Sequence, residues 1–143
     1  MCNKLLVAVD GSATAIRAAQ YAIKLAKENG SVSIHLVTAH EEPRVYGEIA
    51  VYVTPEKMAE LQREAAEGVL EEAEKLIRQA AVPYTREILV GPVASVIAKR
   101  ADELGCDSIV IGTRGMTAIG NLLMGSVATK IVHFAHVPVT LVK

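Results

Sequence analysis

The sequence predicts a single α/β domain built on an open parallel sheet, with helices on both faces. Apolar runs of strand length alternate with amphipathic segments of helix length along all 143 residues. Each crossover between parallel strands needs a helix, and nearly all such crossovers are right-handed. No linker, repeat or low-complexity tract divides the chain, and hydrophobic residues make up 51% of it, enough for one core. We therefore expect residues 1–143 to form one domain.

The first three elements follow one another with short connections. KLLVAV at 4–9 is a continuous apolar run, which is typical of a strand covered on both faces. A helix is predicted over 12–29, because Ser12 can cap its start and Gly30 can end it. SVSIHLVTA at 31–39 is the second predicted strand.

The next predicted helix, over 54–80, is long. Thr54 suits its N-cap and Pro55 its first turn. The third strand, YTREILV, covers 84–90. Helical spacing predicts a buried stripe on this helix made of Met58, Leu61, Ala65, Val69, Ala73, Leu76 and Ala80.

Four further elements complete the alternation. A helix over 92–104 ends before Gly105, and the apolar run at 107–112 is the fourth strand. The last helix is predicted over 126–135 and the last strand over 138–143.

Three connections leave the carboxyl ends of the predicted strands: DGS after the first, residues 40–53 after the second and residues 112–126 after the fourth. Ligands of open α/β sheets bind at this edge, where the strand order reverses. Connections between a strand and the next helix usually take about 2 to 6 residues. Two of the three are longer, which indicates a ligand site.

The third connection, GTRGMTAIGNLLMGS, has the composition of a phosphate-binding loop. Gly112, Gly115 and Gly125 allow the main chain to approach a ligand closely. Gly125 and Ser126 open a helix whose N–H groups and positive dipole end favour a phosphate, with the Ser126 hydroxyl as a further donor. No Lys precedes Ser126, so this is not a Walker A loop, and the spacing is not GxGxxG.

Composition excludes several classes of partner. The net charge is −1 and there is no basic block, which argues against nucleic acids and anionic membranes. No apolar run approaches the roughly 20 residues that a bilayer requires, so we expect a cytoplasmic protein. Cys2 and Cys106 lack the spacing of a zinc or redox motif and are interpreted as ordinary reduced thiols.

The positions of Gly112, Gly115, Gly125 and Ser126 fit G-x2-G-x9-G-[ST], and this pattern resembles that of ATP-binding members of the universal stress protein family. The resemblance extends from LLVAVDGS through ILVGPVASVI, CDSIVIGTRG and MGSVATKIV to VPVTLVK. It implies a Rossmann-like, five-stranded parallel sheet in the order 3-2-1-4-5. ATP would lie across the ends of the first and fourth strands.

The same resemblance implies a set of nucleotide contacts. Asp10 and Val37 would approach the adenine, with Ala8 and Val9 as further binding residues beside Asp10. The other contacts would be Ile111 and Gly112 at the ribose and α-phosphate, and Gly115, Gly125, Ser126 and Val127 at the remaining phosphates. Ala128 stands where some ATP-binding relatives carry a hydroxyl residue.

Several of the candidate binding residues have a structural alternative to a role in binding. Gly112 can simply end a strand, and Asp10 can cap the first helix through the DGS turn as well as bind a ligand. Val37 can be a core residue that offers only its main chain. Arg114 is a candidate for pairing with a phosphate, against the commoner case of a solvated arginine. Asp10 is also the candidate protein ligand for Mg²⁺ bound with ATP.

The sequence favours a regulatory, stress-responsive protein whose nucleotide-bound state is its output, because no convincing catalytic base lies near the proposed phosphates. One alternative is a slow ATPase or nucleotidyl-transferring enzyme that uses Asp10 and Mg²⁺. Another is a dimeric interaction protein without nucleotide. The last strand, from Val137 to Val142, would lie at a sheet edge, and we expect a homodimer through it, as in the resembled family.

Overall fold

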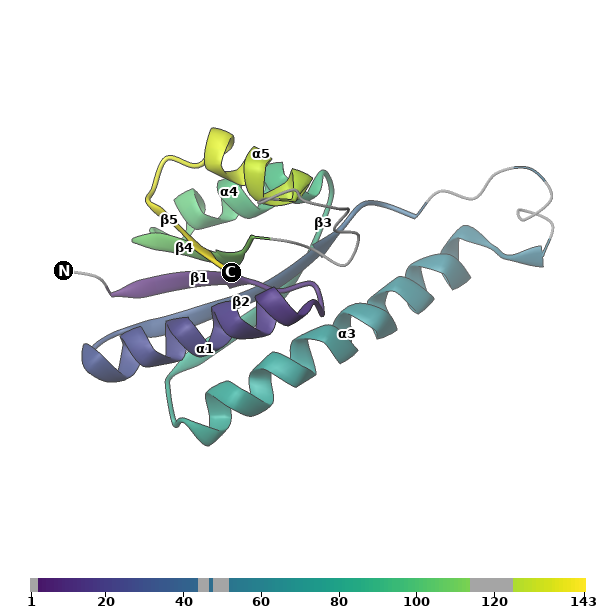
Figure 1. Ribbon diagram of the computed structural model, residues 1–143. Coiled ribbons are helices and arrows are strands. Elements are labelled where there is room, and N and C mark those ends of the chain that lie inside the picture. Colours follow the sequence, from purple (N-terminus) through teal and green to yellow (C-terminus); the bar gives the residue numbers. More distant parts are fainter. Residues whose placement is uncertain (1–2, 44–46, 48–51, 114–124) are drawn as a thin grey trace.

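The computed structural model describes residues 3–43, 47, 52–113 and 125–143, and every element predicted from the sequence is present (Figure 1). Boundaries differ from the expected ones by a few residues at most. The elements are β1 (Lys4–Ala8), α1 (Ala13–Glu28), β2 (Ser33–His40), α3 (Pro55–Gln79), β3 (Tyr84–Val90), α4 (Val93–Glu103), β4 (Ser108–Gly112), α5 (Ser126–Phe134) and β5 (Val139–Val142).

The strands form one parallel sheet in the order β3-β2-β1-β4-β5, which confirms the predicted order. β1 lies at the centre, and its Ala8 is in register with Val37 of β2 and Ile111 of β4. The chain moves outward from β1 in one direction and returns to add β4 on the other side. The topological switch point therefore lies between the carboxyl ends of β1 and β4.

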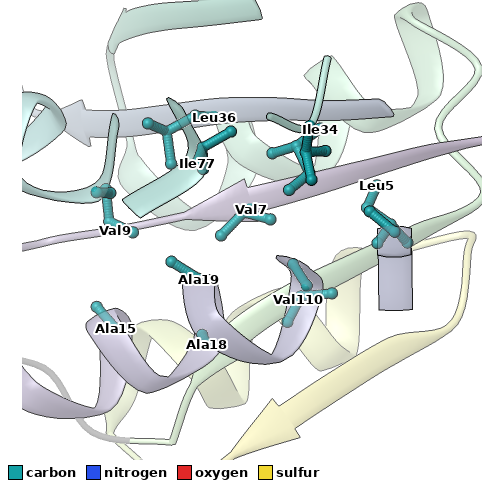
Figure 2. Packing of buried hydrophobic residues seen from close by; sticks show 14 of the residues in the cluster. Leu5, Val7, Val9, Ala15, Ala18, Ala19, Ile34, Leu36, Ile77 and Val110 are labelled. Atoms are coloured by element: carbon teal, nitrogen blue, oxygen red, sulfur yellow. The ribbon is translucent and has the colours of Figure 1, made fainter. Parts of the chain in front are cut away.

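Two helices cover each face of the sheet (Figure 1). On the α1 and α3 side, Val7 and Val9 lie among the alanines of α1 and the aliphatic side chains of neighbouring elements (Figure 2). On the α4 and α5 side, Leu6, Ile109 and Ile111 form a second core. The buried face of α1 is almost entirely alanine, so this helix can lie close to the sheet.

The buried stripe of α3 differs from the predicted one. Of the predicted residues, Ala73 is buried, and Val69 and Ala80 are partly buried and pack against the core. Leu61, in contrast, is 45% exposed. Figure 1 shows why Leu61 is exposed, because the first turns of α3 run past the carboxyl ends of the strands. The buried residues lie in the second half of the helix: Ala66, Leu70, Ala73, Glu74 and Ile77.

Charged side chains of edge strand β3 are paired on both faces of the sheet. On the α3 side, Arg86 donates a hydrogen bond to Glu67 and pairs with Glu74 at 3.5 Å. On the α4 side, Arg100 Nε donates to Glu87 Oε1 at 2.7 Å, and His35 Nε2 lies 3.1 Å from the same oxygen.

These contacts change the pKa of two side chains of β3. The hydrogen bond to Glu67 raises the pKa of Arg86. Partial burial opposes ionisation of Glu87, but the bonds from Arg100 and His35 lower its pKa.

Cys106 lies in the α4 and α5 core, and burial raises the pKa of its thiol. Burial and a raised pKa both reduce the reactivity of a thiol. Cys2 lies outside the described residues. Among the helices of the described residues, none combines the length and apolar character needed to cross a membrane.

Candidate functional site

Three of the expected binding residues form a row across the centre of the sheet. Ala8, Val37 and Ile111 are aligned on β1, β2 and β4, and the N–H of Val9 donates to the carbonyl of Val37 at 2.9 Å. The side chains of Val9, Val37 and Ile111 are buried, whereas Ala8 is partly exposed. Val9, Val37 and Ile111 therefore belong to the core.

The turn after β1 uses Asp10 as a structural acceptor. Asp10 Oδ1 accepts the N–H of Ser12 at 2.9 Å, and Gly11 has a φ of +87°, which favours glycine. Ser12 Oγ then accepts the N–H of Ala15 and caps α1. Asp10 itself is exposed, and among the described residues its Oδ2 has no hydrogen-bond partner. The turn thus uses one oxygen and leaves the other for a ligand.

Gly112, the last residue of β4, lies against the first turn of α1. A Cβ atom at this position would come within 2.4 Å of Thr14 Oγ1 and 2.7 Å of the Thr14 carbonyl carbon. Only glycine allows this approach of helix to strand. Gly112 therefore has a packing role, whatever it contributes to a ligand.

The start of α5 has the features of an anion site. Gly125 is the N-cap, with a φ of −73° and a ψ of 167°, and no side chain of the described residues caps the helix. The Ser126 side chain is exposed, and Val127 is 41% exposed. Ala128 packs into the core and fixes the helix on the sheet. An uncapped helix start with an exposed hydroxyl favours a phosphate.

Thr113 joins this helix start to the sheet, and sequence reasoning missed it. Its carbonyl accepts the N–H of Gly125, and its own N–H donates to the carbonyl of Val142 at 2.9 Å. The residue is buried, although its side chain is polar. The sequence offered one sign of its role, since Thr113 is a polar residue directly after an apolar strand. Through Thr113, the start of α5 is held at the carboxyl end of β4, beside the switch point.

Two expected phosphate contacts, Arg114 and Gly115, lie outside the described residues. Within the described ranges, no group of three or more His, Cys, Asp or Glu side chains is placed to hold a metal ion.

Comparison with known proteins identifies the family. The whole chain, residues 1–143, matches the model of the Universal stress protein family. The chain belongs to the universal stress protein family. Universal stress protein MJ0531 of Methanocaldococcus jannaschii is 31% identical to it over 151 residues, which cover 99% of this chain and 82% of MJ0531. The family resemblance inferred from the glycine pattern is thus confirmed.

Solved structures of universal stress proteins share the fold. The structure of the protein MJ0577 matches with a TM-score of 0.86 and 27% identity, covering 100% of this chain and 96% of its own. A universal stress protein from Archaeoglobus fulgidus, solved in complex with dAMP, matches with a TM-score of 0.68 and 25% identity. That match covers 100% of this chain and 98% of the other. The Rossmann-like architecture is therefore common to this chain and these relatives.

Proposed function

We propose that this universal stress protein binds ATP at the carboxyl ends of β1 and β4, with the phosphates at the start of α5. The observation that carries the proposal is the uncapped N-terminus of α5, whose exposed Ser126 lies beside the topological switch point. The Archaeoglobus relative in complex with dAMP supports an adenine nucleotide as the class of ligand.

The residues in this region suggest a division of roles. The free oxygen of Asp10 is available to the adenine end or to Mg²⁺ carried by ATP. The partly exposed Ala8 and the main chain of Ile111 and Gly112 would accommodate the base and ribose. The Ser126 hydroxyl and the N–H of Val127 would donate to the phosphates, and we assign Arg114 and Gly115 to the same end of the nucleotide.

Binding, rather than turnover, is the proposed output. Phosphoryl transfer needs neutralisation of the γ-phosphate and an oriented nucleophile. Asp10, the nearest candidate base, already uses one oxygen in the turn to Ser12. A regulatory protein in the cytoplasm, where ATP is available, fits this arrangement better than a slow ATPase.

Mass spectrometry of nucleotide released from freshly purified, acid-quenched protein tests the proposal. We expect ATP. Mostly ADP would instead support a slow ATPase. No nucleotide, together with no binding of added ATP, would contradict the proposal and favour an interaction protein without nucleotide.

We also propose that the protein forms a homodimer through the β5 edge. β5 is the last strand of the sheet, so one side of its main chain has no neighbouring strand in the part of the chain that the structure describes. Leu141 is 36% exposed on it, and Val132 and Phe134 of α5 are exposed as well. A two-fold contact would cover this edge and these apolar side chains.

Leu141→Lys is expected to weaken the dimer, because it places two charges in the two-fold interface. Light scattering at micromolar concentration should give a dimer mass for the wild type and a lower mass for the variant. Val90→Lys is the matched control, since it adds the same charge to the opposite edge strand and should leave the dimer intact. A wild-type monomer under these conditions would overturn the assignment.

A further inference from the structure

A cleft of about 520 Å³ lies between α3, β3 and the end of β2, apart from the start of α5. It lies where α3 extends past the carboxyl ends of the strands, so that the sheet only partly covers the first half of the helix (Figure 1). The volume falls within the range of about 300 to 1,000 Å³ that is common for small-molecule sites. His40 and Val90, the last residues of β2 and β3, line it, so it opens at the edge where α/β sheets bind ligands.

The floor of the cleft is apolar. Leu70 of α3 is fully buried beneath it, and Ile88 and Val90 continue it along β3. Val90 is 50% exposed, although the strands of a parallel sheet are normally covered on both faces. An apolar body bound here would cover Val90.

The charges around the cleft leave one arginine without a partner. Its lining carboxylates are already paired: Glu67 binds Arg86, and Glu87 binds Arg100. The nearby Glu74 pairs with Arg78 and accepts a hydrogen bond from the Tyr84 hydroxyl at 2.7 Å. Among the residues that the structure describes, Arg63 has no ion-pair partner, and it is exposed at the cleft.

We propose that this cleft binds a small organic carboxylate with an apolar body. Arg63 binds the carboxylate, and its planar guanidinium matches the two carboxylate oxygens. The apolar body packs on Leu70, Ile88 and Val90. We expect the site to be independent of nucleotide binding, because its residues lie on α3, β2, β3 and, for Pro43, in the segment directly after β2, and none belongs to α5 or β4.

Methyl NMR of the full-length chain tests this proposal, with octanoate as the probe and octanamide and octylammonium as its neutral and cationic counterparts. We expect octanoate to shift the methyl signals of Leu70, Ile88 and Val90 at millimolar concentration, and to bind more tightly than either counterpart. The shifts should persist in the presence of excess ATP. Absence of these shifts, their loss on adding ATP, or equal affinity for the three probes would overturn the proposal.

Two variants in the cleft, with a control variant on α1, test whether the preference for a negatively charged ligand arises in the cleft. Arg63→Gln should weaken octanoate binding about tenfold, the loss expected for a charge-assisted hydrogen bond. Lys24→Gln, which removes one positive charge from the exposed face of α1, should leave it unchanged. Val90→Glu should reverse the preference toward octylammonium, because it places a carboxylate on the floor. Unchanged affinity in Arg63→Gln would show that Arg63 does not hold the ligand.

Discussion

Gly125→Val is expected to abolish detectable binding of ATP while the domain stays folded. The valine side chain would occupy the space in front of the helix start, where the phosphates are proposed to lie. The backbone at Gly125 has a φ of −73° and a ψ of 167°, an extended conformation that valine adopts readily. Its N–H can still donate to Thr113. Isothermal titration with ATP should show no binding, with circular dichroism to verify folding.

Ser126→Ala is expected to weaken the binding of ATP without abolishing it. It removes one hydroxyl donor, and a hydrogen bond to a charged acceptor is worth about 1.5 to 3 kcal/mol. ATP should therefore bind roughly ten- to a hundredfold more weakly, whereas AMP, which lacks the outer phosphates, should be affected much less. Equal affinities for ATP, ADP and AMP in the wild type, or no effect of Ser126→Ala, would show that the phosphates do not bind at this helix start.

Gly112→Ala should destabilise the whole domain. The added methyl group would meet Thr14 Oγ1 at 2.4 Å and the Thr14 carbonyl carbon at 2.7 Å, and the second of these is main chain that moves only with α1. Overpacking of this kind costs about 1 to 3 kcal/mol. Urea denaturation should show a lower midpoint with an unchanged m-value.

Gly68→Ala provides the matched control for Gly112→Ala. Gly68 lies inside α3, and no atom would lie within 4 Å of an added Cβ. The same substitution should here raise the free energy of unfolding by up to about 1 kcal/mol, because alanine favours the helix. If both variants shifted the midpoint in the same direction, the close packing of Gly112 on Thr14 would not be the cause.

The sequence predicted the fold in detail, because short apolar runs and helical periodicity are local properties. The runs KLLVAV and SIVIG become β1 and β4, and Ser12 and Thr54 cap α1 and α3 as expected. Alternation alone indicated a parallel sheet but left the strand order open, and the order 3-2-1-4-5 came from the family resemblance.

The predicted buried stripe of α3 was wrong in the first half of the helix. Met58 and Leu61 have helical spacing with Ala65, but spacing does not reveal where the sheet beneath a helix ends. Glu74 is buried although it carries a carboxylate, which Tyr84 of β3 and Arg78 of α3 satisfy. These contacts depend on tertiary structure and could not be derived from the local pattern.

Two local features of the candidate site agree with the sequence, whereas the binding of a nucleotide by these residues stays a prediction. The glycine spacing located the helix start at Gly125, and the DGS turn located Asp10. The packing role of Gly112 depends on the approach of α1 to β4, which no local pattern reveals. The same holds for Thr113, whose two main-chain bonds join segments far apart in the sequence.

The two edges of the sheet differ in what they offer to another strand. β3 carries Arg86 and Glu87 on opposite faces, each held by helix side chains, and charges along an edge discourage pairing. β5 consists of uncharged residues only. In a two-fold contact, the β5 edges of the two copies would pair with each other. The charged β3 edges would then remain at the two ends of the dimer. Growth by strand addition would then end at two subunits, and the charges on the β3 edge strand would keep the proposed dimer from extending into a fibre.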